Sequence, residues 1–179
     1  MTSMTMTDER TPRPGAMSNL HAALDACPTL DASARILRRD IEEHSGLDAE
    51  TRELVFLREA RLRHSEYCWH NHALEARALG IEDAEITALE HWRSSERVRF
   101  DARQRAVLGY VDALVHGGPV SETVRHVLAS ELTESEIVGL TMLIGLAWTE
   151  TAAAAGLALP SEEPFLGWEL YRGTASVTL

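Results

Sequence analysis

The sequence has 179 residues, of which 45% are apolar, and this is enough to bury the core of one domain. Its 17 basic and 28 acidic residues give a net charge of −11, which argues against nucleic acid and anionic membrane surfaces as partners. Every basic residue is arginine, so chemistry that needs a lysine amine is excluded: Schiff bases, pyridoxal phosphate and the P-loop phosphate site.

The chain has two cysteines, too few for a disulfide scaffold, which favours a reducing compartment. Residues 1–18 are rich in Thr, Pro and Ser and lack the apolar stretch of a secretory signal, so we expect a disordered leader. No run approaches the ~20 apolar residues that a membrane span needs. These features predict a cytoplasmic protein with one domain over residues 19–179, whose C-terminal tail begins at residue 160.

Helix-forming residues dominate, and no alternating run of β-branched residues predicts a strand, so the fold class is all-α. Asp31 and Asp48 stand where N-cap residues are expected. Capping residues and the spacing of apolar residues together predict roughly seven helices. Their expected ranges are 32–45, 49–64, 67–79, 83–90, 102–116, 122–129 and 134–157.

Two capping boxes mark helix starts in the second half of the chain. Asp101 pairs with Gln104 in one of them, and Thr133 pairs with Glu136 in the other. The helix after the second box is apolar almost all round as far as Trp148. We therefore expect it to be the central, buried helix.

Residues with useful chemistry gather between positions 53 and 80. Cys68 and His72 are four residues apart, so on a helix the imidazole can reach the sulfur. Cys68 falls in the first turn of its expected helix, where unpaired N–H groups and the helix dipole favour a thiolate. We expect His72 to be a proton shuttle, and Cys68 to be a nucleophile, a weak acid or a small buried residue.

Two glutamates of the preceding helix differ in their surroundings. Glu53 has no cation four residues away and lies on the apolar face, so we expect a buried carboxylate that acts as an acid or base. Glu59 has Arg63 four residues later and is expected to form an ordinary surface pair. Along an unbroken helix, Glu53 and Ser65 would lie ~18 Å apart. Contact between Glu53 and His72 therefore requires a break in the helix.

The spacing of these residues resembles a known signature. Glu53, Ser65, Cys68 and His72 follow the pattern E-x11-C-x2-C-x3-H of the alkylhydroperoxidase D-like (AhpD-like) and carboxymuconolactone decarboxylase-like superfamily, with serine at the first cysteine. The resemblance covers about residues 36–159. It implies an AhpD-like all-helical subunit that assembles into homo-oligomers, trimers or hexamers. It also implies a pocket in which carboxylate and imidazole relay protons to the thiol.

Ser65 is the departure from that pattern. A serine cannot close the Cys-x-x-Cys disulfide, so a sulfenic acid at Cys68 would need Cys27, an external thiol or a second subunit to resolve it. Nothing in the sequence places Cys27 near Cys68. The departure therefore disfavours a dithiol peroxidase and favours the acid–base side of the superfamily.

A metal and an organic cofactor are both unexpected. His64, Cys68 and His72 recur every four residues and His70 adds a fourth potential ligand, but His70 would point away and no second cluster completes a tetrahedral shell. No glycine-rich nucleotide loop is present. Several arginines of this segment are candidates for pairing with a substrate carboxylate: Arg58, Arg61, Arg63 and Arg77. Trp148 and Glu150 could line the same pocket, but no pattern singles them out.

The sequence thus predicts a carboxymuconolactone decarboxylase-like enzyme with cofactor-free acid–base chemistry. The expected reaction is a decarboxylation, isomerisation or related carbon–carbon step on a small acidic or carbonyl metabolite. Glu53 would be the base or orienting group, His72 the shuttle, Cys68 the acid or nucleophile, and Ser65 a hydrogen-bonding group for substrate. Two alternatives stay open: a single-cysteine thiol-dependent peroxidase, and a non-catalytic helical binding or assembly protein.

Overall fold

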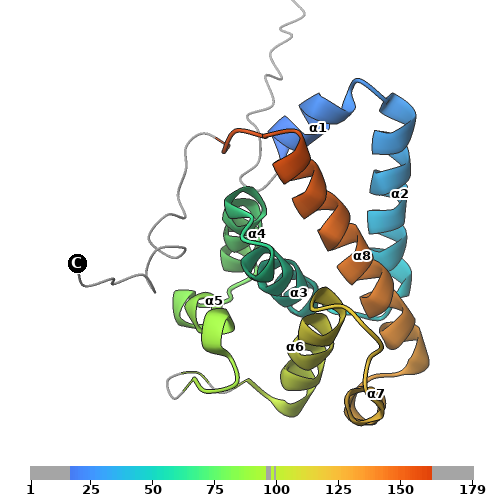
Figure 1. The fold of residues 1–179 in the computed structure, drawn as a ribbon, viewed down its shortest axis with the longest axis vertical. Helices are drawn as coiled ribbons and strands as arrows, with labels where there is room; N and C mark the ends of the chain where they lie inside the picture. The colour runs from blue at the N-terminus through green and yellow to red at the C-terminus, as the bar shows by residue number, and fades with distance from the viewer. Residues whose placement is uncertain (1–16, 96–97, 99, 163–179) are drawn as a thin grey trace, which may run out of the picture.

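The computed structural model describes residues 17–95, 98 and 100–162, and these form an all-helical fold (Figure 1). Within these ranges it contains eight α-helices and one short 3-10 helix, Leu89–His91. The α-helices are α1 Ser18–Leu24, α2 Pro28–His44, α3 Ala49–Leu62, α4 Glu66–Ala78, α5 Asp83–Ala88, α6 Ala102–Val115, α7 Glu122–Glu131 and α8 Glu134–Gly156. The all-α prediction is confirmed. Residues 1–16 of the expected leader and residues 163–179 of the expected C-terminal tail lie outside the described residues.

The helix that the sequence did not predict is α1. It has seven residues and begins after Met17 without a side-chain cap, so local signals do not mark it. Contacts with distant residues hold it instead, because the N–H of Leu20 donates to the hydroxyl of Tyr67 at 3.0 Å. Met17 is buried and α1 starts at Ser18, so ordered structure begins inside the range expected to be a leader.

The second helix starts earlier than its expected cap. Pro28 occupies the first turn of α2, where its missing N–H costs nothing. Asp31 is therefore inside the helix, where its carboxylate accepts hydrogen bonds from His21 at 2.7 Å and Arg35 at 2.8 Å. The expected caps at Asp48, Asp101 and Thr133 are confirmed, each accepting from a backbone N–H three residues later.

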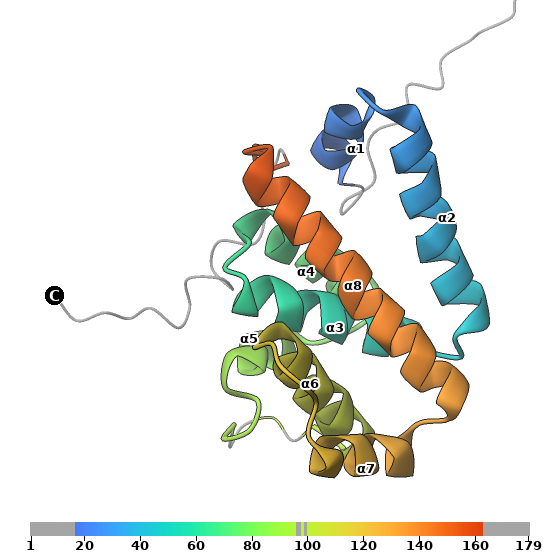
Figure 2. The same cartoon turned by 45° about the vertical axis from the view of Figure 1, so that its right-hand side comes forward.

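Helix α3 is the centre of the fold. It packs against α4, α6 and α8, and α2 runs along the other side of α8 (Figures 1 and 2). Two apolar clusters fill the spaces between these helices, one around Trp69 of α4 and one around Leu143 of α8. Side chains from α2, α3, α4 and α8 can therefore meet in one place.

The expectation that α8 is buried all round is wrong. Val138, Met142 and Trp148 are 59%, 46% and 53% exposed, so one apolar side of the helix faces outward. The prediction that no segment is apolar enough to span a membrane also needs correction, because Glu134–Gly156 passes that test by length and composition. Half of the apolar window in this helix is buried inside the fold.

Candidate active site

A break between α3 and α4 brings the predicted site residues together. The chain reverses at residues 63–65, where His64 adopts a left-handed backbone conformation with φ 56°. The side chain of Ser65 then accepts from the N–H of Cys68 and starts α4. As a result α4 folds back along α3, and the predicted row of His64, Cys68 and His72 on one helix does not exist because His64 lies in the turn.

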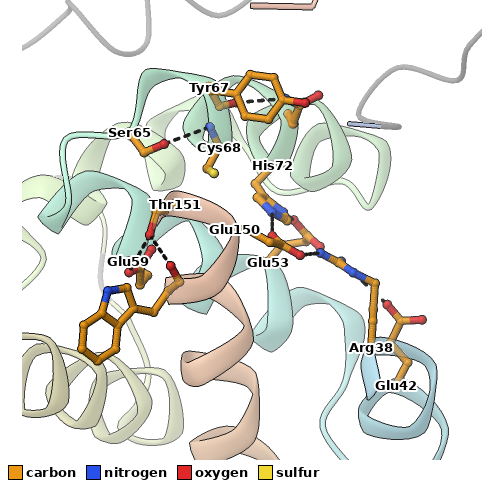
Figure 3. Close-up of polar contacts among 12 residues, drawn as sticks. Arg38, Glu42, Glu53, Glu59, Ser65, Tyr67, Cys68, His72, Glu150 and Thr151 are labelled. Carbon is orange, nitrogen blue, oxygen red and sulfur yellow. Dashed lines mark hydrogen bonds and ion pairs between the residues drawn. The ribbon is translucent and has the colours of Figure 1, made fainter. Parts of the chain in front are cut away.

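His72 lies between two carboxylates. Its Nδ1 is 2.8 Å from Oε2 of Glu53 on α3, and its Nε2 is 3.4 Å from Oε2 of Glu150 on α8 (Figure 3). The imidazole stacks on the ring of Phe56, with centroids 4.0 Å apart and planes within 5° of parallel. All three ionisable side chains are buried. The ring is thus fixed in orientation and in contact with acceptors on both nitrogens.

Arg38 of α2 completes this cluster. Its guanidinium forms an ion pair with Oε1 of Glu150, so the Glu150 carboxylate bridges Arg38 and His72 (Figure 3). The guanidinium also lies over the ring of Phe56, 4.6 Å from its centroid. We call Glu53, His72, Glu150 and Arg38 the charge relay cluster. In it two acids alternate with two basic groups.

The carboxylates keep His72 protonated. Burial disfavours the imidazolium, but Glu53 and Glu150 outweigh it and raise the pKa of His72 from 6.5 to about 9. Burial likewise disfavours the Glu150 carboxylate, yet hydrogen bonding to His72 and the charge of Arg38 hold its pKa below its ordinary value. At neutral pH the site therefore holds an imidazolium, which can give up a proton.

Cys68 is placed as predicted but is not a thiolate. It lies in the first turn of α4, and its side chain points toward α8 (Figure 3). Burial raises the pKa of the thiol to about 12, although the hydrogen bond to Ser65 lowers it, and the charges of Glu150 and Glu59 add to the increase. The expectation that the helix start favours the thiolate is therefore wrong, because desolvation exceeds the effect of the helix dipole. Cys27, the other cysteine, is exposed at the start of α2.

Glu59 is also buried, contrary to its expected surface pairing. The side chain is fully inaccessible, accepts a hydrogen bond from Thr151 at 3.2 Å and lies 3.3 Å from Arg63. Burial raises its pKa from 4.5 to about 7, although Thr151 and Arg63 pull in the other direction. The i,i+4 pairing with Arg63 is present, but no local pattern indicates that α8 covers this face of α3.

A cavity of about 560 Å³ reaches the charge relay cluster. Helices α1, α2 and α8 form its walls, and Arg38, Glu53, His72 and Glu150 are all among its lining residues. Cys68 and Ser65 are not among them. Of the four predicted site residues, Glu53 and His72 can therefore contact a small molecule in this cavity, whereas Ser65 and Cys68 do not line it.

No sequence pattern indicated that Arg38 belongs to the site, and none singled out Glu150. Both belong to helices far from the Cys68–His72 segment, so no local spacing connects them to it. Among the four arginines proposed to meet substrate, Arg58 instead pairs with buried Asp112 at 2.6 Å. Trp148 lies under Arg63 on the outer side of α8 rather than in the cavity. In the described part of the chain, no group of three or more His, Cys, Asp or Glu residues is arranged to hold a metal ion.

The sequence profile of the carboxymuconolactone decarboxylase family matches residues 28–113, which include Arg38, Glu53 and His72 but not Glu150. No curated protein matches the sequence.

Several solved structures share the fold. A protein of unknown function from Agrobacterium tumefaciens, described as a candidate antioxidant defence protein AhpD, is 25% identical with a TM-score of 0.73, over 78% of this chain and 95% of its own. A cysteine-to-alanine variant of the debrominase Bmp8 in complex with 2,3,4-tribromopyrrole is 16% identical with a TM-score of 0.71, over 97% and 94%. A peroxidase-related protein from Silicibacter sp. TM1040 is 18% identical with a TM-score of 0.67, over 91% and 97%.

Proposed function

The chain belongs to the carboxymuconolactone decarboxylase and AhpD-like superfamily, and within it we propose an enzyme that transfers protons to carbon without a redox disulfide. The observation that carries this proposal is the position of His72. Its imidazolium is held between Glu53 and Glu150 at the wall of a cavity large enough for a metabolite. Enzymes use such a buried, oriented imidazole as a general acid.

Glu53 orients the His72 imidazolium, and Glu150 lies beside Nε2, on the side from which the substrate must approach. The shorter contact, 2.8 Å from Nδ1 to Glu53, fixes the ring, whereas the contact from Nε2 to Glu150 is 3.4 Å. Glu150 is held independently by Arg38. Nε2–H is therefore the proton that a substrate atom can receive.

A protonated imidazole favours decarboxylation. In that step the bond between the substrate carbon and its carboxylate breaks, CO₂ leaves, and the electron pair stays on carbon. The carbon then takes the proton from Nε2 of His72, and water entering the cavity returns a proton to the ring. The Arg38 guanidinium can also stabilise the developing enolate oxygen. It has five N–H donors, and the ion pair with Glu150 uses only some of them. The substrate class is a small acid with a carbonyl next to the bond that breaks.

The test is turnover of a panel of 3-oxo acids and carboxylated lactones in D₂O. We expect CO₂ release and one deuterium on the product carbon. Because general acids contribute about 10²- to 10⁴-fold, His72→Gln should lose activity by that factor. Cys68→Ser should keep most of it, and Glu43→Gln, on the exposed side of α2, is the matched control. Equal loss in Cys68→Ser, or full activity in His72→Gln, would contradict the proposal.

A single-cysteine peroxidase is the second candidate. It is favoured by the separation of one helical turn between Cys68 and His72 and by the AhpD-like neighbour at 25% identity. The thiolate would attack the peroxide, leaving a sulfenic acid on Cys68 and releasing an alcohol. Two equivalents of an external thiol would then restore Cys68, forming water and a disulfide. Peroxide consumption with dithiothreitol that is abolished in Cys68→Ser would support this candidate.

A non-catalytic helical assembly protein is the outcome if both assays fail.

We place the protein in the cytoplasm as a homo-oligomer, a trimer or hexamer, with a small-molecule substrate and without nucleic-acid or membrane partners. The reducing character expected from two free cysteines supports the compartment. The exposed apolar side of α8 supports the oligomer.

A further inference from the structure

The residues of α2 that line the cavity change from apolar to charged along the helix. Leu30, Ala34 and Arg38 are spaced by four residues, and all three line the cavity, so one stripe of the helix runs from apolar to charged. Eight residues of helix correspond to ~12 Å. The apolar end of the cavity therefore lies about one small-molecule length away from the charge relay cluster.

Aliphatic side chains from the other walls meet the apolar end. Leu20 and Leu24 of α1 and Ala153 of α8 line the same cavity. Leu30 is 61% exposed although it faces this cavity. An apolar group placed here would remove aliphatic surface from water, which favours binding in proportion to the area covered.

We propose that the cavity selects a carboxylic acid with an extended apolar body, and that Ala34 and Leu30 of α2 determine how large this body can be. The inference rests on the proposed function in taking the His72 end as the reactive end. The carboxylate lies toward Arg38 and the body extends between α1 and α2 toward Leu30. Short, fully polar acids leave the apolar end unfilled.

On α2 the cavity is lined by three arginines and one glutamate, Glu42, so this helix provides the side of the charged end that suits an acid. Arg35 and Arg39 flank Arg38 and also line the cavity. Arg35 donates its Nε–H to Asp31, and a guanidinium has further N–H groups for a second acceptor. Carboxylates are the ligands that such planar donors match in pairs.

The walls fit a small molecule better than a partner helix. Three helices surround the space, and its volume of about 560 Å³ lies within the range of ~300–1,000 Å³ typical of small-molecule pockets. The buried imidazole lies at one end of it. A rod-like acid can reach that end, whereas a helix would need the walls to separate.

The experiment measures binding separately from turnover. Butanoate, hexanoate, octanoate and 4-phenylbutanoate are titrated into the full-length His72→Gln variant and the wild type by calorimetry and ligand-observed NMR. We expect octanoate to bind about tenfold or more tightly than butanoate, since each buried methylene adds to the affinity. Ala34→Phe should weaken octanoate about tenfold and leave butanoate within about twofold.

Ala32→Phe is the matched control, because Ala32 is exposed on the same helix and does not line the cavity. Affinity that does not depend on chain length, or equal effects of Ala32→Phe and Ala34→Phe, would overturn the inference. A change of oligomeric state in Ala34→Phe, seen by light scattering, would also overturn it, because a second copy would then fill the cavity. If binding depends on chain length but the D₂O assay shows no CO₂ release and no deuterium in the product, this inference is supported and the proposed function fails.

Discussion

Glu53 and His72 are 19 residues apart in the sequence, and their side chains are 2.8 Å apart in the fold. The left-handed turn at His64 and the cap at Ser65 make this possible, because they reverse the chain between α3 and α4. Both residues are then buried, so the carboxylate acts on the imidazole with little screening by water. The contact fixes the orientation of the ring and favours the imidazolium form of the proposed acid.

Cys68 should react slowly with alkylating reagents. Its thiol is buried with a pKa raised to about 12, whereas Cys27 is exposed. With iodoacetamide at pH 7.5, we expect one modification per chain at Cys27 within minutes and modification of Cys68 only after denaturation. Peptide mass spectrometry assigns the sites. Equal rates at the two cysteines would show that the thiol is activated and would favour the peroxidase.

Ser65 should act on stability through its cap. Its hydroxyl accepts from the N–H of Cys68, so Ser65→Ala should lower the free energy of unfolding by ~1 kcal/mol. Ser121→Ala is the matched control, because Ser121 caps α7 in the same way far from the site. Urea denaturation measures both. If Ser65→Ala leaves stability unchanged but weakens substrate binding, Ser65 contacts substrate, as the sequence led us to expect.

The sequence was sufficient to predict the features that local interactions determine. The boundaries of α3, α4, α6 and α8 followed from caps and apolar spacing, and the Glu53–His72 pair followed from a motif whose intervening turn is itself capped by Ser65. It was insufficient for contacts between distant helices. Glu150 and Arg38 are separated by 112 residues, and only the packing of α2 on α8 brings them together.

The same limit explains the incorrect expectations. The first-turn position of Cys68 and the i,i+4 spacing of Glu59 were read correctly, but desolvation by α8 determines how both groups ionise. Helix α1 was missed because Tyr67, 47 residues from Leu20, supplies its contact. Conversely, α8 was expected to be buried because composition does not distinguish a helix that is covered on all sides from one with an exposed apolar side.

The exposed side of α8 should be an oligomer contact. Val138→Glu places a charge on that side, and because Val138 is 59% exposed in one subunit, the fold itself should tolerate it. Light scattering coupled to size exclusion should show a trimer or hexamer for the wild type and smaller species for the variant. Ser130→Glu on exposed α7 is the control and should not change the mass. A monomeric wild type would contradict the prediction.

Stability should fall as the pH rises through the neutral range. The folded state holds protons more tightly at His72, whose pKa is raised from 6.5 to about 9, so its contribution is complete below pH 6.5 and is lost by about pH 9. At 1.36 kcal/mol per pKa unit this amounts to about 3 kcal/mol. Glu59, raised from 4.5 to about 7, acts in the same direction at lower pH.

Urea denaturation between pH 5 and 9 measures this dependence. His72→Gln should flatten the curve above pH 7, and Glu59→Gln should flatten it below pH 7. A wild-type curve that does not fall between pH 6.5 and 9 would mean that His72 is neutral in the folded protein.

The most direct measurement is the NMR titration of the His72 ring nitrogens in wild type, Glu53→Gln and Glu150→Gln. We expect an imidazolium at pH 7.5 that loses its proton near pH 9, in line with its raised pKa of about 9. Each glutamine variant should lower that value, and Glu43→Gln on the exposed side of α2 should not. A wild-type ring that titrates near its ordinary value of 6.5, with no response to either variant, would contradict the account.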